Sequence, residues 1–179
     1  MMSRGNRRGD IFRETEDYQV YLAILEEATT KYVFDLHDYC LMTNHVHLQI
    51  ETTIFEIWHI MKFINLMYTL YFNEKYNLIG HLFQGRYNAE IIKDDAYTLQ
   101  TSRYIHLNPV KAKMVSTPVE YAWSSYDVYM GKRESRFVKV EKILRYFENN
   151  NRLLYQKFVE GASTHSEIDV EIDEKMEES

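Results

Sequence analysis

The chain has 179 residues, 45% hydrophobic and 15% aromatic, so it can bury the core of one domain and is not wholly disordered. Its net charge of −6 is concentrated at one end: residues 160–179 hold eight acidic residues and one lysine, and the remainder carries +1. A single cysteine, Cys40, excludes a disulfide framework and a four-cysteine zinc site. No signal peptide opens the chain and no apolar run approaches roughly 18–20 residues, which indicates a cytoplasmic protein with no membrane association.

The first fifty residues combine one helical pattern with two extended patterns. The N-terminal stretch 1–13 is basic and contains two glycines, which predicts a loop. Beyond it, apolar residues first recur at helical spacing and then give way to aromatic and branched residues typical of strands. The predicted elements are a helix over about 16–31 capped by Thr15, and a hairpin of strands 33–42 and 45–51 joined at Thr43–Asn44.

The remainder of the chain predicts further helices and one more strand. All six glycines fall between the proposed elements, which supports the division. The predicted elements are a helix over 54–76, a strand over 87–93, a helix from Asp94 or Asp95 to Asn108 stopped by Pro109, and short amphipathic helices in 140–147 and 152–159. The pattern indicates an α+β main domain over 1–130, a helical appendage over 131–160 and an acidic tail over 161–179 that we expect to be disordered.

A histidine pair stands on the second predicted strand, in the sequence TNHVHLQIE. Side chains two apart on a strand point the same way, so His45 and His47 project from one face, followed by Gln49 and Glu51. Such a pair is either half of a metal site or part of a polar, solvent-facing strand surface. By itself the motif favours the polar surface, since a metal needs at least one more ligand.

The sequence SRYIHLNPV offers that ligand together with a nucleophile. On a helix, Tyr104 and Asn108 share a face, whereas His106 points elsewhere. A phenolate can attack phosphorus, and two imidazoles with one amide oxygen suit Mn²⁺ or hydrated Mg²⁺ better than a structural zinc ion. The chain has 15 tyrosines, however, and Asn before Pro is also a common helix end, so the spacing alone does not single out Tyr104.

Four motifs in register resolve this choice: NHVHLQIE, HLFQGRY, SRYIHLNPVKA and AWSSY. Over about residues 3–130 the chain resembles the HUH-type single-strand DNA transposases, in the branch called REP-associated tyrosine transposases. The resemblance implies a ferredoxin-like antiparallel sheet with the histidine pair on a central strand and helices packed on it. It further implies that His45, His47 and Asn108 bind a catalytic Mg²⁺ or Mn²⁺ and that Tyr104 is the nucleophile.

The activity implied is that of an endonuclease and strand transferase, which cuts and rejoins single-stranded or hairpin DNA through a 5′-phosphotyrosine intermediate. Basic and polar residues near these motifs are the candidate DNA contacts. They are Arg4, Asn6, Arg7, Arg8, Arg86, Lys111 and Lys113. The resemblance leaves monomer and homodimer open.

One departure from the family pattern concerns the start of the sheet. Relatives have a strand immediately before the SRGN stretch, but here only Met1 and Met2 precede Ser3, so we expect that strand to be missing or truncated. Two other readings therefore stay open. One is a domesticated or decayed protein that binds hairpins without cutting them, and the other is an unrelated metallohydrolase with a water nucleophile.

Overall fold

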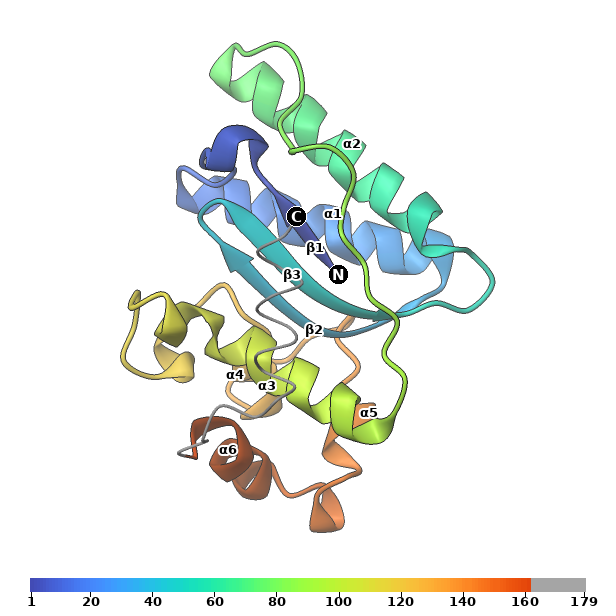
Figure 1. Ribbon diagram of the computed structural model, residues 1–179, viewed down its shortest axis with the longest axis vertical. Coiled ribbons are helices and arrows are strands. Elements are labelled where there is room, and N and C mark those ends of the chain that lie inside the picture. Colours follow the sequence, from blue (N-terminus) through green and yellow to red (C-terminus); the bar gives the residue numbers. More distant parts are fainter. Residues whose placement is uncertain (162–179) are drawn as a thin grey trace.

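The computed structural model describes residues 1–161, which form a three-stranded antiparallel sheet with helices on both faces (Figure 1). The strands are β1 (Met2–Arg4), β2 (Asp35–Met42) and β3 (His45–Glu51), in the order β1-β3-β2. The longer helices are α1 (Thr15–Tyr32), α2 (Ile57–Tyr76), α3 (Asp95–Lys111) and α6 (Arg152–Glu160), and the short ones are α4 (Tyr126–Tyr129) and α5 (Glu141–Leu144). The expected α+β class, with helices packed on an antiparallel sheet, is confirmed.

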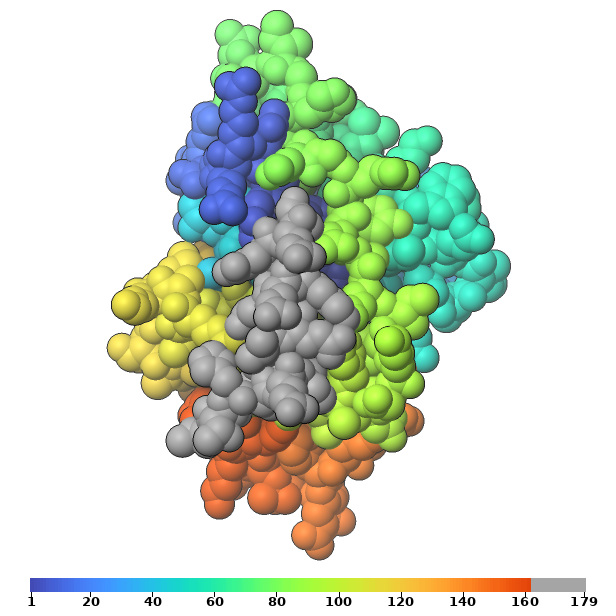
Figure 2. All heavy atoms as spheres, in the orientation of Figure 1, coloured from blue at the N-terminus to red at the C-terminus, as the bar shows by residue number. Residues whose placement is uncertain are grey.

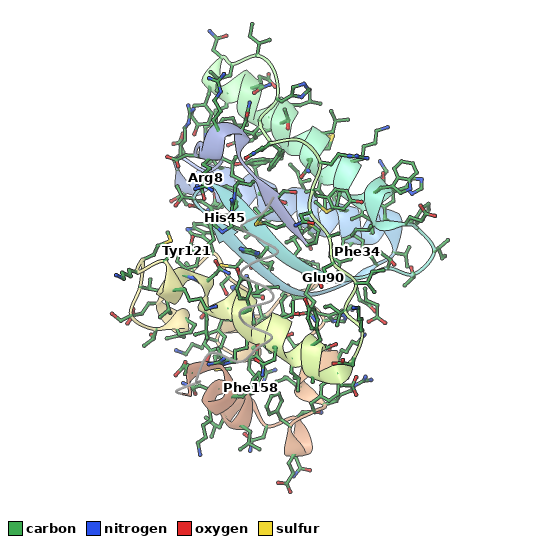
Figure 3. The ribbon with its side chains drawn as sticks, viewed as in Figure 1. Arg8, Phe34, His45, Glu90, Tyr121 and Phe158 are labelled. Atoms are coloured by element: carbon green, nitrogen blue, oxygen red, sulfur yellow. The ribbon has the colours of Figure 1, made fainter. Side chains whose placement is uncertain are left out.

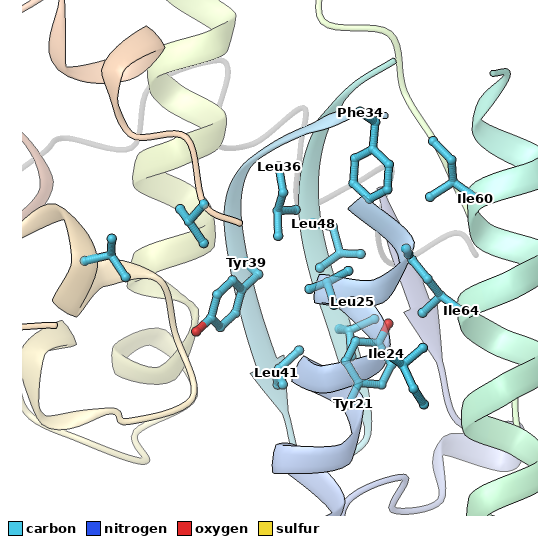
Figure 4. Packing of buried hydrophobic residues seen from close by; sticks show 14 of the residues in the cluster. Tyr21, Ile24, Leu25, Phe34, Leu36, Tyr39, Leu41, Leu48, Ile60 and Ile64 are labelled. Atoms are coloured by element: carbon cyan, nitrogen blue, oxygen red, sulfur yellow. The ribbon is translucent and has the colours of Figure 1, made fainter. Parts of the chain in front are cut away.

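The main hydrophobic core lies between one face of the sheet and helices α1 and α2 (Figure 4). Because strand side chains alternate, Val46 and Leu48 of β3 point into this core and are fully buried. Leu36 of β2, Leu25 of α1 and Ile64 of α2 meet them there, and each is fully buried too. This core holds β3 in the middle of the sheet, and the same alternation turns the histidines to the opposite face.

Helix α3 covers that opposite face. The Ser102 hydroxyl donates to Asp38 Oδ1 of β2 at 2.9 Å, and Gln49 Nε2 of β3 donates to the Thr98 carbonyl at 3.3 Å. A second, smaller apolar cluster holds the helix against β2, and its buried members are Cys40, Met42, Tyr104, Ile105 and Tyr121. The helix that carries the predicted nucleophile is therefore fixed directly over the two strands of the hairpin.

The N-terminal stretch is not entirely a loop, because its first residues form β1. Met2, Ser3 and Arg4 pair with β3 in antiparallel register, with Met2 opposite His47 and Arg4 opposite His45. Strand β1 spans three residues, and backbone bonds from Met1 to Leu48 continue the ladder by one residue. This short strand pairs with β3 beside the two histidines, along the edge of β3 that does not contact β2.

The predicted strand over 87–93 is absent, and this prediction was wrong. The segment passes beside β1 but makes only one bridge, in which Asn88 and Met2 exchange backbone hydrogen bonds of 2.8 and 2.9 Å. Branched side chains such as Ile91 and Ile92 favour extended backbone, but a strand also needs a neighbour along its length. Within residues 1–161 no such neighbour lies beside 89–93.

Two helix boundaries also differ from expectation. Helix α1 is capped by Glu14 and not by Thr15, because the Glu14 side chain and Asp17 form a reciprocal capping box. Helix α3 continues past Pro109 to Lys111. A proline in the last turn removes one backbone hydrogen bond without ending the helix, so the loss is tolerated here. The start of α3 was predicted at Asp94 or Asp95. Asp94 caps the helix, because its side chain accepts a hydrogen bond from the Tyr97 N–H at 2.8 Å.

The segment after Gly131 packs against the edge of β2 and against α3. Val138 forms a parallel bridge with Leu36, and Tyr155 of α6 is fully buried. The expectation of a disordered acidic tail concerns residues that lie, except for 161, outside those that the structure describes. Within residues 1–161, no helix is both long and apolar enough to cross a bilayer.

Candidate active site

The two histidines lie side by side on β3, the central strand, on the face that α3 covers. Their ring centroids are 4.8 Å apart and the rings are perpendicular. His47 is 2% exposed, and within residues 1–161 neither of its ring nitrogens has a hydrogen-bond partner. A buried polar group normally has a partner, so this imidazole, with both nitrogens unsatisfied among the described residues, is a candidate ligand.

His45 is half-buried and its orientation is fixed by its neighbour in the chain. Its Nδ1 lies 2.7 Å from the Asn44 side-chain oxygen, which can only accept a hydrogen bond, so Nδ1 carries the proton. This tautomer leaves the lone pair on Nε2. Asn44 is in turn held by its own amide, which donates to the Arg8 carbonyl at 3.2 Å. Such a partner behind an imidazole is typical of histidines that ligate metals.

Tyr104 of α3 faces His47 across the gap between helix and sheet. The two ring centroids are 5.6 Å apart at an interplanar angle of 86°, and Tyr104 is 6% exposed. Asn108, one helical turn later, hydrogen-bonds His45 through its side chain, and its Nδ2 lies 3.5 Å from the Tyr104 carbonyl. The structure thus brings all four predicted residues together, although they come from segments about sixty residues apart.

Electrostatics keep both imidazoles neutral at pH 7. Burial lowers the pKa of His45 to about 4, helped by the positive charge of Arg4 and opposed by the hydrogen bond to Asn108. Burial likewise holds the pKa of His47 well below its ordinary value, with further contributions from His45, the N-terminus, Arg4 and Lys111. Neutral imidazole is the form that binds a metal, so protons compete weakly with a cation here.

The donor set fits a divalent cation. It comprises the unsatisfied nitrogens of His47, Nε2 of His45, which the tautomer leaves without a proton, and the side-chain oxygen of Asn108. Two nitrogens and an amide oxygen match Mn²⁺ or Mg²⁺ that keeps several waters better than a closed zinc site. In the part of the chain that the structure describes, no three His, Cys, Asp or Glu residues cluster as metal ligands, and Asn108 is the predicted third ligand beside the two histidines.

Comparison with known proteins identifies the family. Residues 1–108 match the family model described as "Transposase IS200 like", which covers more than half of the chain. The chain belongs to the IS200-like transposase family. The match ends at Asn108, so it includes the histidine pair and the predicted nucleophile. A search of curated proteins found no significant match.

A solved structure supports the same fold. The chain superposes on a REP-associated tyrosine transposase bound to a REP hairpin with a TM-score of 0.62 and 14% sequence identity, over 77% of this chain and 88% of that chain. At this identity the similarity establishes the fold. IS200-like transposases generally use a divalent metal, in agreement with the donor set at His45, His47 and Asn108.

The candidate DNA contacts of the N-terminal loop and of Arg86 lie next to each other. Backbone bonds from Asn6 to Leu82 and from Gln84 to Arg4 place the N-terminal loop beside the segment that carries Arg86, and both are at the surface (Figure 2). Figure 3 shows the exposed Arg8 on the same side of the molecule as His45.

On the α3 side of the site, Lys111 Nζ lies 4.5 Å from the Tyr104 ring centroid, and Lys113 follows in the turn after α3. Cationic residues of both β1 and α3 therefore stand near the histidine pair.

A cavity of about 400 Å³ opens next to the site. Its lining includes His47, Gln49, Glu90, Thr101 and Tyr104. Its volume lies within the range of small-molecule pockets, roughly 300–1,000 Å³.

Several residues that support the site were missed by the sequence reasoning. Asn44 was assigned only to the turn, although its position directly before the first histidine was a usable signal. No sequence pattern indicates the roles of Ser102, Arg103 and Tyr155. Their contacts join α3 to α6, and about forty residues of chain separate these helices.

Proposed function

We propose that this IS200-like transposase is a metal-dependent DNA endonuclease and strand transferase, of the REP-associated tyrosine transposase branch, that acts on single-stranded or hairpin DNA. The observation that carries the proposal is the pairing of Tyr104 with His47. A tyrosine faces a buried imidazole that, within residues 1–161, has no hydrogen-bond partner, inside the region matched by the family model.

The residues divide into metal ligands and a nucleophile. His45, His47 and Asn108 would hold Mg²⁺ or Mn²⁺, which supplies Lewis-acid stabilisation of charge on the phosphate and on the departing oxygen. Tyr104 attacks phosphorus through its phenolic oxygen, the bond from phosphorus to the 3′ oxygen breaks, and the phenolic proton is released. The departing 3′ oxygen takes up a proton, so the products are a 5′-phosphotyrosine and a free 3′-OH.

The phosphotyrosine conserves the energy of the phosphodiester bond. A different 3′-OH can therefore attack it in the reverse direction, joining two DNA ends without ATP. The protein's part is to keep Tyr104 close to the phosphate throughout, which the packing of α3 on the sheet provides. The cations near the site would hold the DNA backbone; they are Arg4 and Arg86 from the N-terminal and 81–87 segments, and Lys111 and Lys113 from the end of α3.

The test is the covalent adduct itself. A panel of labelled single-stranded hairpins, including those that flank the gene, is incubated with protein and Mn²⁺ or Mg²⁺ and resolved on a denaturing gel. Wild type and the Tyr97→Phe control, which changes another tyrosine of α3, should give the adduct, and Tyr104→Phe should not.

Other results identify the alternatives. An adduct retained by Tyr104→Phe would show that the nucleophile is misassigned. Hairpin binding without any cleavage, with either metal, would indicate a binding protein that lacks catalysis. Cleavage that survives Tyr104→Phe but is lost in His45→Ala would indicate a water nucleophile.

A further inference from the structure

The C-terminal helix α6 contacts α3 at residues that flank the nucleophile in sequence. The Tyr155 hydroxyl lies 2.7 Å from Ser102 Oγ and 2.6 Å from His106 Nδ1. Tyr155, Ser102 and His106 are all fully buried. One hydroxyl of α6 thus bridges two residues of α3 that are one turn apart.

Arg103 forms a second connection. Its Nε donates to the carbonyls of Phe158 at 3.0 Å and Val159 at 3.3 Å, and one terminal nitrogen donates to the Gly161 carbonyl at 3.2 Å. These carbonyls lie at the C-terminal end of α6, where helical carbonyls lack partners and the helix dipole is negative. Arg103 therefore caps α6 while standing next to Tyr104 in the chain.

These contacts are on the opposite side of α3 from the active site. Tyr104 and Asn108 face the histidines, whereas Ser102 and His106 face away from them. In Figure 3, α3 runs between the strand labelled at His45 and the helix labelled at Phe158. The helix is held between two surfaces, and α6 provides the one behind it.

The network also reaches the sheet. Ser102 Oγ bonds Asp38 Oδ1, and His106 Nε2 lies 2.7 Å from Ser125 Oγ, which itself accepts from the Tyr39 N–H at 2.9 Å. Rotation or sliding of α3 would break several buried hydrogen bonds at once, each costly to leave unmade. The position of Tyr104 is thereby coupled to the docking of α6.

We propose that α6 positions the active site, with Tyr155, Ser102 and Arg103 as positioning residues that hold Tyr104 and Asn108 against the histidines. The match to the family model ends at Asn108, so α6 lies outside the matched region. The effect on catalysis rests on the proposed function. The effect on structure, that α3 opens more easily when its contacts with α6 are lost, is independent of the proposed function.

The decisive variant is Tyr155→Phe, which keeps the ring and removes the hydroxyl. The matched control is Tyr68→Phe, which removes another fully buried hydroxyl, one that donates to the Ile11 carbonyl on the far side of the sheet. Hydrogen exchange is measured first, without DNA or metal. Amides of α3 around 104–108 should exchange faster in Tyr155→Phe than in Tyr68→Phe, since local opening then costs less.

Mn²⁺ affinity and adduct formation follow. Because Asn108 is displaced relative to the histidines, Mn²⁺ should bind about 10-fold more weakly to Tyr155→Phe, measured by electron paramagnetic resonance. At saturating hairpin DNA and Mn²⁺ the adduct should form at least about 10-fold more slowly, while the apparent Kd for DNA stays unchanged. Tyr68→Phe should match wild type in all three measurements.

The inference is overturned if Tyr155→Phe folds and matches Tyr68→Phe in α3 exchange and Mn²⁺ affinity. Should Tyr155→Phe fail to fold, Arg103→Gln replaces it and the same comparison decides. A wild-type protein that forms no adduct with any substrate refutes the proposed function alone, because the exchange and Mn²⁺ measurements still decide whether α6 positions α3.

Discussion

Tyr104 and His47 of the same chain face each other edge to face, with ring centroids 5.6 Å apart. One residue comes from the middle of α3 and the other from the centre of β3, so the site is assembled by packing one helix on one hairpin. Tyr104, the predicted nucleophile, and the histidine pair thus lie together within one chain. Changes that separate α3 from β3 should therefore affect metal binding and cleavage together.

His47→Ala should abolish Mn²⁺ binding at little cost in stability, because within residues 1–161 the imidazole makes no hydrogen bond that the mutation would break. His37 is the matched control. It is 3% exposed on the neighbouring strand, but its ring bonds the Lys139 carbonyl and Glu51 Oε2, each at 3.0 Å. His37→Ala should lower the Tm and leave Mn²⁺ affinity intact. Equal losses of Mn²⁺ affinity in the two variants would contradict the assignment.

Two substitutions of Asn108 test whether this residue is a metal ligand or only ends helix α3. Asn108→Ala should weaken Mn²⁺ binding by about 10-fold or more, whereas Asn108→Asp, which keeps the oxygen and adds charge, should bind Mn²⁺ at least as tightly as wild type. Isothermal titration with Mn²⁺ measures both. If Ala and Asp behave alike, the side-chain oxygen is not a ligand, and Asn108 serves only the end of α3.

The sequence allowed prediction of whatever depended on local periodicity. The hairpin, its two-residue turn and the facing direction of His45 and His47 follow from the two-residue period of a strand, and the common face of Tyr104 and Asn108 follows from the helical period. The order and spacing of the four motifs then predicted that the histidines of the strand and Tyr104 and Asn108 of the helix form one site. The spacing within each motif did not predict this, since it left a polar strand surface as the simpler interpretation of the histidine pair.

The features that were missed depend on partners remote in sequence. The segment 87–93 has the composition of a strand, but whether it becomes one depends on the length of β1 beside it. Pro109 was expected to stop α3, but a proline in the last turn removes one bond without blocking the next. The amphipathic pattern of 152–159 predicted a helix correctly, yet nothing in it indicates that Tyr155 reaches Ser102.

Asp17 should be the residue whose loss most destabilises the α1–α2 pair. It is fully buried and accepts hydrogen bonds from the Arg13 N–H, Lys75, Tyr71 and Tyr76 at 2.7 to 2.9 Å. Burial alone would raise its pKa, but these bonds lower it to about 2. Asp17→Ala leaves Lys75 without its buried partner and should cost about 3–5 kcal/mol of unfolding free energy, measured by urea denaturation.

Glu16→Ala is the control for that measurement, because Glu16 also pairs with Lys75 at 2.9 Å but its side chain is 64% exposed. An exposed pair of this kind should cost less than about 1 kcal/mol. Similar losses in Asp17→Ala and Glu16→Ala would refute the claim that burial makes the difference.

Stability should fall as the pH is lowered from about 6.5, the ordinary pKa of histidine. Burial lowers the pKa of His106 to about 3 and that of His45 to about 4. Below pH 6.5 these histidines become protonated in the unfolded chain but stay neutral in the folded chain, which favours unfolding. Asp38 acts in the opposite direction, since burial raises its pKa to about 6, but it offsets only part of the effect of the histidines.

The measurement is the Tm at pH 7 and at pH 5. His106→Asn should lower the Tm at both values but reduce the difference between them. The exposed His81, replaced by Asn, should leave that difference as it is in wild type. A wild-type Tm that rises on acidification would contradict the sign of this prediction.

The N-terminal loop should bind the DNA backbone. Arg7 and Arg8 are exposed in a turn that the Asn6–Leu82 backbone bond holds beside the site, so each can neutralise a phosphate. Replacing either by Ala should reduce the slope of log Kd against log salt concentration by about 0.7 for single-stranded DNA. Lys62→Ala, which removes an exposed cation from α2 on the other face of the sheet, should leave the slope unchanged. If Lys62→Ala lowers the slope equally, binding reflects overall charge, and this loop is not a contact surface.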